Sequence, residues 1–139
     1  MAFVSIPKEI PTKGFRDCHD ITEEVRRDVA KSGITAGLVN VFITGSTAGI
    51  TTIEYEDGAV RDFIDTIEKI IPQDGVYKHN LKWGDGNGFS HSRGALIGPS
   101  ITIPLVKGKL QLGQWQQIIL IDFDNKERSR KYLVNILGE

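Results

Sequence analysis

Apolar residues recur with a helical period in two parts of the chain. Isoleucine and valine return every fourth residue over positions 21–29 and stop before Gly33, which predicts an amphipathic helix. Asp20 followed by Glu23 three residues later is the pattern of a capping box at the start of this helix. Two turns of apolar stripe before a glycine therefore indicate one packed helix near the N-terminus.

A longer apolar stripe follows in the middle of the chain. Valine, phenylalanine and isoleucine over positions 60–71 are spaced three and four residues apart, which predicts a second helix that packs on a sheet. Asp57 is expected to cap its N-terminus, and Pro72 to end it. This is the clearest helical pattern in the sequence.

Shorter β-branched and apolar runs predict strands. They lie at positions 3–7, 37–43, 50–55, 100–106, 110–123 and 130–137. Pro7 and Pro11 place the first strand at the edge of a sheet, and the last three strands are expected to form an antiparallel meander. Because strands outnumber the two main helices and cluster at the C-terminus, the pattern predicts an α+β fold in a single domain over residues 1–139.

Between positions 73 and 98 the periodicity disappears, and we expect a long, functional loop. Two of the three histidines, His79 and His91, lie here with Asp85 and Arg93, and five glycines occur between positions 75 and 94. Imidazole can bind metal or transfer protons near neutral pH, and a guanidinium can bind an anion through two hydrogen bonds. The alternative is an ordered surface loop in which the histidines only cap turns.

Composition and charge limit the classes of partner. The chain has 139 residues, 40% hydrophobic and 25% charged, and a formal charge of −1, which predicts a compact protein and no nucleic-acid binding. No stretch approaches the roughly 20 apolar residues that a membrane span needs, so no membrane partner is expected. The single cysteine cannot form an internal disulfide and is consistent with the cytoplasm.

A hydroxyl-rich turn and an acidic pair provide weaker candidates. Ser46 and Thr47, between two predicted strands, offer hydroxyl and backbone N–H groups that can hold phosphate, although such a stretch is more often a plain connection. Glu54 and Glu56 could act as acid–base groups or Mg²⁺ ligands, or could only favour the N-terminus of the next helix. Trp115 is interpreted as a core residue, with a pocket or a subunit contact as alternatives.

Several short motifs occur together in the second half of the chain. They are Asp85-Gly86-Asn87-Gly88, Ser90-His91, Ala95-Leu96-Ile97-Gly98, Leu110-Gln111-Leu112-Gly113 with Trp115-Gln116, and Leu137-Gly138-Glu139. The sequence from about Val41 onward, which contains these motifs, resembles the YjbQ-like family, whose members have been labelled secondary thiamine-phosphate synthases. The resemblance implies a small, mostly antiparallel, sandwich-like α+β fold and a homotrimer with sites near subunit boundaries. It also implies an activity that joins a pyrimidine pyrophosphate to a thiazole phosphate.

The resemblance also assigns roles by position. His79 and His91 match histidines of the family's polar site, and Glu54 and Asp85 match its acidic positions, so these four are the candidate catalytic residues. Ser46, Thr47 and Arg93 are the candidate ligand-binding residues. His91 would carry a proton, and Arg93 or a carboxylate-bound Mg²⁺ would compensate the charge of the leaving phosphates.

Two departures from the family pattern leave a second hypothesis open. Gly45 and Phe89 stand where family members usually have histidine. A catalytic zinc site generally uses three protein ligands, and only two imidazoles remain unless a carboxylate completes the set. The chain is therefore either a transferase that handles a small phosphorylated molecule, with Mg²⁺ or Zn²⁺ as a possible cofactor, or a non-catalytic, ligand-binding or structural homotrimer.

Overall fold

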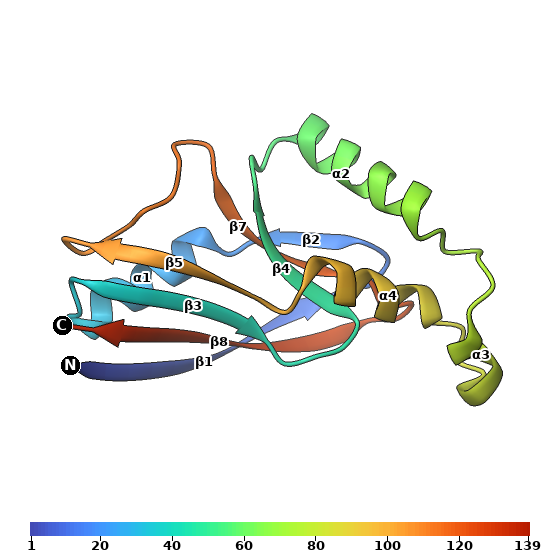
Figure 1. The fold of residues 1–139 in the computed structure, drawn as a ribbon, viewed down its shortest axis with the longest axis horizontal. Coiled ribbons are helices and arrows are strands. Elements are labelled where there is room, and N and C mark those ends of the chain that lie inside the picture. Colours follow the sequence, from blue (N-terminus) through green and yellow to red (C-terminus); the bar gives the residue numbers. More distant parts are fainter.

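The computed structural model describes residues 1–139 and contains two antiparallel sheets and four helices (Figure 1). The strands are β1 (Ala2–Thr12), β2 (Asp17–Asp20), β3 (Gly37–Ile43), β4 (Ala48–Ile53), β5 (Ser100–Val106), β6 (Lys109–Leu110), β7 (Gln117–Asp122) and β8 (Arg128–Gly138). The helices are α1 (Thr22–Ser32), α2 (Asp57–Ile70), α3 (Lys78–Trp83) and α4 (Gly88–Ile97). The predicted α+β class with antiparallel sheets is confirmed.

The larger sheet has the strand order β1-β8-β3-β5-β6, and the smaller sheet has the order β2-β7-β4. β1 pairs with β8 over its whole length, from Ala2 opposite Gly138 to Thr12 opposite Arg128, so the two chain termini lie side by side (Figure 1). β1 is an edge strand, as its two prolines predicted, but it is longer than the run at 3–7 indicated. Proline has no backbone N–H to donate to a neighbouring strand, and an edge strand has no neighbour on its outer side.

The main core fills the space between the large sheet, α1 and one face of the small sheet. Sixteen buried apolar residues form it: Ile21, Val25, Val29, Ile34, Val39, Val41, Ile43, Ala48, Ile50, Ile103, Leu105, Ile118, Leu120, Tyr132, Val134 and Ile136. On the other face of the small sheet, Ile121 and Phe123 pack against Ile67 of α2. The central strand β7 is therefore buried on both faces, which explains its continuous apolar sequence.

The first helix ends as predicted but begins differently. Gly33 follows α1 with φ of 73°, a left-handed conformation that glycine adopts without steric cost. The capping box is wrong, because the Asp20 carboxylate accepts hydrogen bonds from the N–H and hydroxyl of Thr22, whereas Glu23 binds Arg26 one turn further along. Asp20 therefore forms a local turn with Thr22 at the start of the helix instead of a capping box.

The second helix has a different capping residue from the one expected. Glu56, not Asp57, is the N-cap of α2, and its two carboxylate oxygens accept the backbone N–H groups of Gly58 and Ala59. These bonds satisfy donors that the first turn of a helix leaves free. None of the helices is long and apolar enough to cross a membrane.

Two other predictions from the pattern are wrong. The expected loop at 73–98 contains α3, which has only six residues, and α4, in which Gly88 and Gly94 weaken the helical signal. The expected meander does not form, because the run at 110–123 is divided between β6 in one sheet and β7 in the other. Trp115 lies in the connection between them with 65% of its surface exposed, so it is not a core residue.

Replacing Leu120 by alanine should lower the free energy of unfolding by about 3 kcal/mol, because the fully buried side chain leaves a cavity in the main core. Urea unfolding followed by circular dichroism measures the change. Leu81→Ala is the control, because this side chain is 84% exposed on α3 and its truncation should change stability by less than about 0.5 kcal/mol. Equal losses in the two variants would contradict the assignment of the core.

Candidate functional site

A polar hollow of about 440 Å³ lies where β3 ends and α3 and α4 meet the start of β8. This end of the molecule is opposite the two chain termini (Figure 1). Only one of the eleven residues that line the hollow, Trp83, is hydrophobic. The other ten are Thr44, Gly45, Ser46, Thr47, His79, Asp85, Asn87, His91, Arg128 and Arg130. Three separate parts of the chain thus contribute side chains to one site.

The turn at 44–47 forms one wall of the hollow, between β3 and β4. The backbone N–H groups of Gly45, Ser46 and Thr47 donate no hydrogen bond within the chain. Helix α4 approaches this turn closely at Gly94, where a Cβ atom would lie 3.0 Å from the carbonyl oxygen of Ser46. The small residue lets α4 pack on the turn, and His91, one helical turn earlier, reaches the hollow as a result.

A buried ion pair supports the turn from behind. The Arg130 guanidinium donates to both oxygens of Asp122 at 2.8 Å, and its Nη2 also donates to the Thr47 hydroxyl at 2.6 Å. Asp122 is fully buried and Arg130 is 7% exposed. Because each charge has a close partner, the pair fixes the end of β7, the start of β8 and the turn relative to one another.

Asp124 is a second buried carboxylate beneath the hollow. It accepts hydrogen bonds from Asn125 N–H, Asn87 Nδ2, Arg128 Nε and the Thr47 hydroxyl. Burial opposes ionisation, but these four donors outweigh it and lower the pKa of Asp124 to about 2. The carboxylate is therefore charged at neutral pH, and it joins the turn to the N-terminus of α4.

Two histidines that line the hollow are in contact with each other. The ring centroids of His79 on α3 and His91 on α4 are 4.3 Å apart, and the ring planes are tilted by 51°. Burial and then the neighbouring His79 lower the pKa of His91, with Asp124 and Asp85 opposing the shift. His79 Nε2 lies 3.6 Å from a carboxylate oxygen of Asp85, which is an ion-pair distance only when the imidazole is protonated. At neutral pH the pair thus favours the uncharged imidazole at His91.

Two buried polar atoms of the hollow lack a partner. His79 Nε2 and Asn87 Oδ1 are buried and make no hydrogen bond within the chain. Buried polar groups without a partner are uncommon and costly, and they recur at sites that bind ligands or water. The hollow therefore combines free donors on the turn with free side-chain atoms on the two helices.

Comparison with protein families assigns the chain. The model of the family described as UPF0047 protein YjbQ-like matches residues 8–139. The chain belongs to this family. A UPF0047 protein from Methanothermobacter thermautotrophicus is 35% identical over 95% of this chain and 92% of its own length. A Mycobacterium bovis family member is 40% identical over 67% of this chain and 73% of its own length.

Solved structures of YjbQ-like proteins share the fold. A YjbQ-like protein of unknown function from Sulfolobus solfataricus superposes with a TM-score of 0.89 at 33% identity, covering 99% of this chain and 100% of its own. A member of the family from Clostridium acetobutylicum superposes with a TM-score of 0.87 at 36% identity, covering 95% and 99%. The two-sheet architecture is thus similar to that of family members from an archaeon and a bacterium.

Five of the seven residues that the sequence selected lie together in this YjbQ-like chain. They are Ser46, Thr47, His79, Asp85 and His91, all in the wall of the hollow. Glu54 is not among them, because it follows the other end of β4, about 20 Å of extended strand from the turn. Its match to the family's acidic position does not bring it to the hollow.

Arg93 is the other residue that does not line the hollow. Its side chain is fully buried, and it donates to Glu68 and to the carbonyl oxygen of Ile71 on the side of α2. Phe89, at a position where the family usually has histidine, is 2% exposed, and its ring lies 5.0 Å from the Arg93 guanidinium. Arg93 therefore joins α4 to α2, and the predicted anion clamp at this residue is not formed.

The donor set does not suit a zinc ion held by three protein ligands. No three histidine, cysteine, aspartate or glutamate side chains come together in an arrangement that could hold a metal ion. His79, Asp85 and His91 supply only a loose set, and Gly45 adds no imidazole. We therefore derive no step through a metal.

Sequence reasoning missed Asn87, Arg128 and Arg130. The predicted strand at 130–137 starts at Arg130, and Arg128 precedes it, yet both lie in the inward phase that buried Tyr132, Val134 and Ile136 set along β8. A charged residue in the inward phase of a strand indicates a buried ion pair or a site. Asn87 carried no signal beyond its place in the glycine-rich motif.

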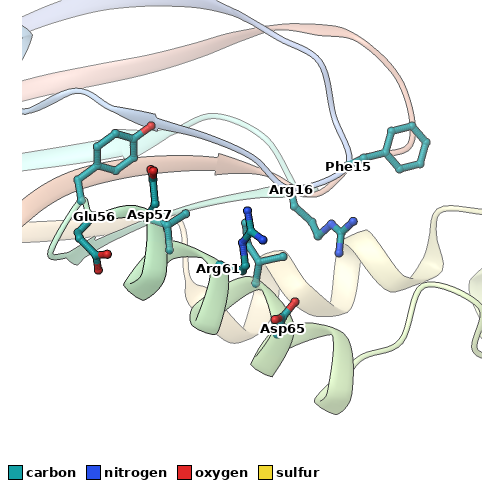
Figure 2. Close-up of a pocket in the computed structure, with 9 residues that line it drawn as sticks. Phe15, Arg16, Glu56, Asp57, Arg61 and Asp65 are labelled. Carbon is teal, nitrogen blue, oxygen red and sulfur yellow. The ribbon is translucent and has the colours of Figure 1, made fainter.

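A larger hollow of about 530 Å³ lies between α2 and the turn after β1, and Figure 2 shows its walls. Arg16 comes from the turn, whereas Arg61 and Asp65 come from α2. No histidine lines it, and the Glu56 carboxylate there is occupied in capping α2. The smaller hollow, which has unpaired buried atoms, is therefore the better candidate.

Asp124→Asn should destabilise the protein by about 3 kcal/mol or more at pH 7, because it leaves Arg128 without its buried partner. The folded-state pKa of Asp124 lies below its ordinary value, so its contribution is complete above about pH 4 and falls as pH drops through 2. The native protein should then lose about 2 kcal/mol more than the variant between pH 5 and pH 2.

Urea unfolding at several pH values measures both quantities. Asp85→Asn is the control, because this side chain is half exposed and its replacement should leave the pH dependence of stability nearly unchanged. Parallel pH profiles for the native protein and Asp124→Asn would contradict the role of Asp124 as a buried, ionised hub.

Proposed function

We propose that the hollow binds a small phosphorylated molecule and that the chain acts on it as a transferase of the thiamine-phosphate synthase type. The turn at 45–47 carries this proposal, because its three residues line the hollow and their backbone N–H groups lack partners within the chain. Successive free N–H groups in a turn are a common way to bind phosphate oxygens. The Ser46 hydroxyl can add a further donor.

The reaction would join two phosphorylated heterocycles. The bond between the pyrimidine methylene carbon and the pyrophosphate oxygen breaks, the thiazole nitrogen forms a new bond to that carbon, and pyrophosphate leaves. The turn would bind the leaving pyrophosphate and offset the charge that develops on it. His91, after taking a proton from solvent, would donate it to the leaving group, and His79 would hold the imidazole in place.

A non-catalytic role is the second candidate, and a specific observation favours it. Gly45 and Phe89 remove two imidazoles at positions where the family usually has them, and Phe89 is buried away from the hollow. The remaining groups could bind a phosphorylated ligand without changing it. Either function would be carried out in the cytoplasm, where the single Cys18 stays reduced.

The outer face of the large sheet supports the assembly of a homotrimer. Phe3, Leu137 and Leu38 lie in one row across β1, β8 and β3, and 65%, 44% and 48% of their surfaces are exposed. A second row, Ser5, Asn135, Asn40 and Thr102, is hydrogen-bonded within itself. Such a face can be covered by another copy without leaving polar groups unpaired, as subunit interfaces require.

His91→Ala should lower the rate of thiamine phosphate formation by at least about 100-fold, because it removes the proton donor. The assay mixes the pyrimidine pyrophosphate and the thiazole phosphate with Mg²⁺ and measures the product by chromatography. His19→Ala is the matched control, because His19 is on β2 and binds Asp17 outside the hollow. Turnover by neither the native chain nor the control would overturn catalysis, and binding of pyrophosphate without turnover would support the second candidate.

Leu38→Glu should convert the proposed trimer into monomers, because a carboxylate would be buried without a partner in the interface. Sedimentation velocity at micromolar concentration measures the change. Leu81→Glu is the control, because Leu81 is equally apolar and more exposed, but lies on α3 rather than on the sheet. A native protein that sediments as a monomer would contradict the homotrimer.

A further inference from the structure

One nitrogen of the Arg130 guanidinium has no hydrogen-bond partner within the chain. Nε and Nη2 bind Asp122, and Nη2 also donates to the hydroxyl and the carbonyl oxygen of Thr47. Nη1 makes none of these bonds, and it stays open to solvent in a side chain that is otherwise only 7% exposed and lines the hollow. A charged donor that is open to solvent and already oriented by a buried carboxylate can bond to an acceptor that a ligand supplies.

Gly45 lies directly beside this free nitrogen. A Cβ atom at position 45 would be 2.8 Å from Arg130 Nη1, and the next nearest atom, Cζ of the same side chain, would be 3.9 Å away. A carbon atom at 2.8 Å is closer than van der Waals contact allows, so any side chain would cover or displace Nη1. The guanidinium cannot move aside freely, because Asp122 and Thr47 hold it through several hydrogen bonds.

The backbone does not require glycine at position 45. Eight glycines of the chain have positive φ, and Gly45 is not one of them, so its conformation is open to residues with a side chain. The local effect of the glycine is instead to leave Nη1 uncovered. Gly45 therefore determines whether Arg130 Nη1 is accessible in the hollow.

We propose that Gly45 exposes Arg130 Nη1 as the group that recognises a phosphoryl oxyanion in the hollow. The proposal rests on the function proposed above and adds to it the side chain that selects the ligand. Arg130, whose Nη1 lies beside Gly45, and the residues of the turn all line the hollow, so a tetrahedral oxyanion bound there could accept bonds from several of their donors. A planar carboxylate would accept bonds from fewer of these donors.

The charges around Arg130 indicate how the hollow would select an oxyanion. Asp122 and Asp124 offset the charges of Arg130 and Arg128, so the wall has donors without a large net positive charge. The bidentate bond to Asp122 also fixes the plane of the guanidinium before a ligand arrives. Recognition therefore depends on the direction of the donors, which a covering side chain at position 45 would disturb.

Calorimetric titration with orthophosphate tests the proposal. Gly45→Ala should weaken orthophosphate binding by at least about tenfold. Gly113→Ala is the matched control, because a Cβ atom there would meet only Gln116, at 3.6 Å, outside the hollow, and it should bind as the native chain does. Sodium acetate serves as the planar oxyanion and should bind the native chain more weakly than orthophosphate.

The outcomes separate this proposal from the one before it. Equal orthophosphate affinity in the native chain and in Gly45→Ala would overturn the role of Arg130 Nη1. If His91→Ala nevertheless lost affinity for orthophosphate, the hollow would still be the binding site. Absence of binding to the native chain would overturn both. Should Gly45→Ala unfold, the side-chain NMR signals of Arg130 in the native chain decide, because they must shift during the titration if Nη1 binds the anion.

Discussion

Two buried carboxylates at the end of β7 hold the functional end of the molecule together. Asp122 binds Arg130 and also accepts a hydrogen bond from Thr12 at the end of β1, whereas Asp124 binds Arg128 and Asn87. Charges in the interior are tolerated only when they are paired. The two ion pairs are local to the β7–β8 connection, whereas the hydrogen bonds to Thr12, Thr47 and Asn87 reach elements distant in sequence. The network thus determines where the β3–β4 turn and α4 meet, and so where the hollow forms.

The same network shapes the chemistry of the hollow. The arginines already have carboxylate partners, so the wall provides directed donors while its charges largely cancel. Helix α4 adds His91, whose pKa is lowered by burial and then by the neighbouring His79. Helix α4 carries His91 toward the turn because Gly94 allows close packing there. The ends of the strands thus provide fixed donors from Arg128 and Arg130, and helix α4 provides the imidazole of His91.

The sequence predicted the periodic elements well and the site only in part. Apolar stripes located α1 and α2, and β-branched runs located β3, β5 and most of β8, because their burial is regular. Helix α3 was missed because six residues are too few for a clear period, and α4 because Gly88 and Gly94 interrupt its pattern. The division of the run at 110–123 between two sheets depends on tertiary packing. Ser46, His79 and His91 were chosen by chemical type and do come together, but Arg93 was not distinguishable from a ligand-binding arginine until its partner Glu68 was placed.

The fixed donors and His91 together imply that anion binding and proton uptake are linked. Without a ligand, burial and the neighbouring His79 lower the pKa of His91, so this imidazole is mainly neutral at pH 7. An anion held by the turn would place negative charge opposite the imidazole and raise that pKa, so the bound state would favour protonated His91. By the same linkage, affinity for an anion of fixed charge would increase as pH falls toward 6. The proton that a leaving phosphate needs would then arrive with the ligand, which is how a hollow with little net charge of its own could still stabilise an anion.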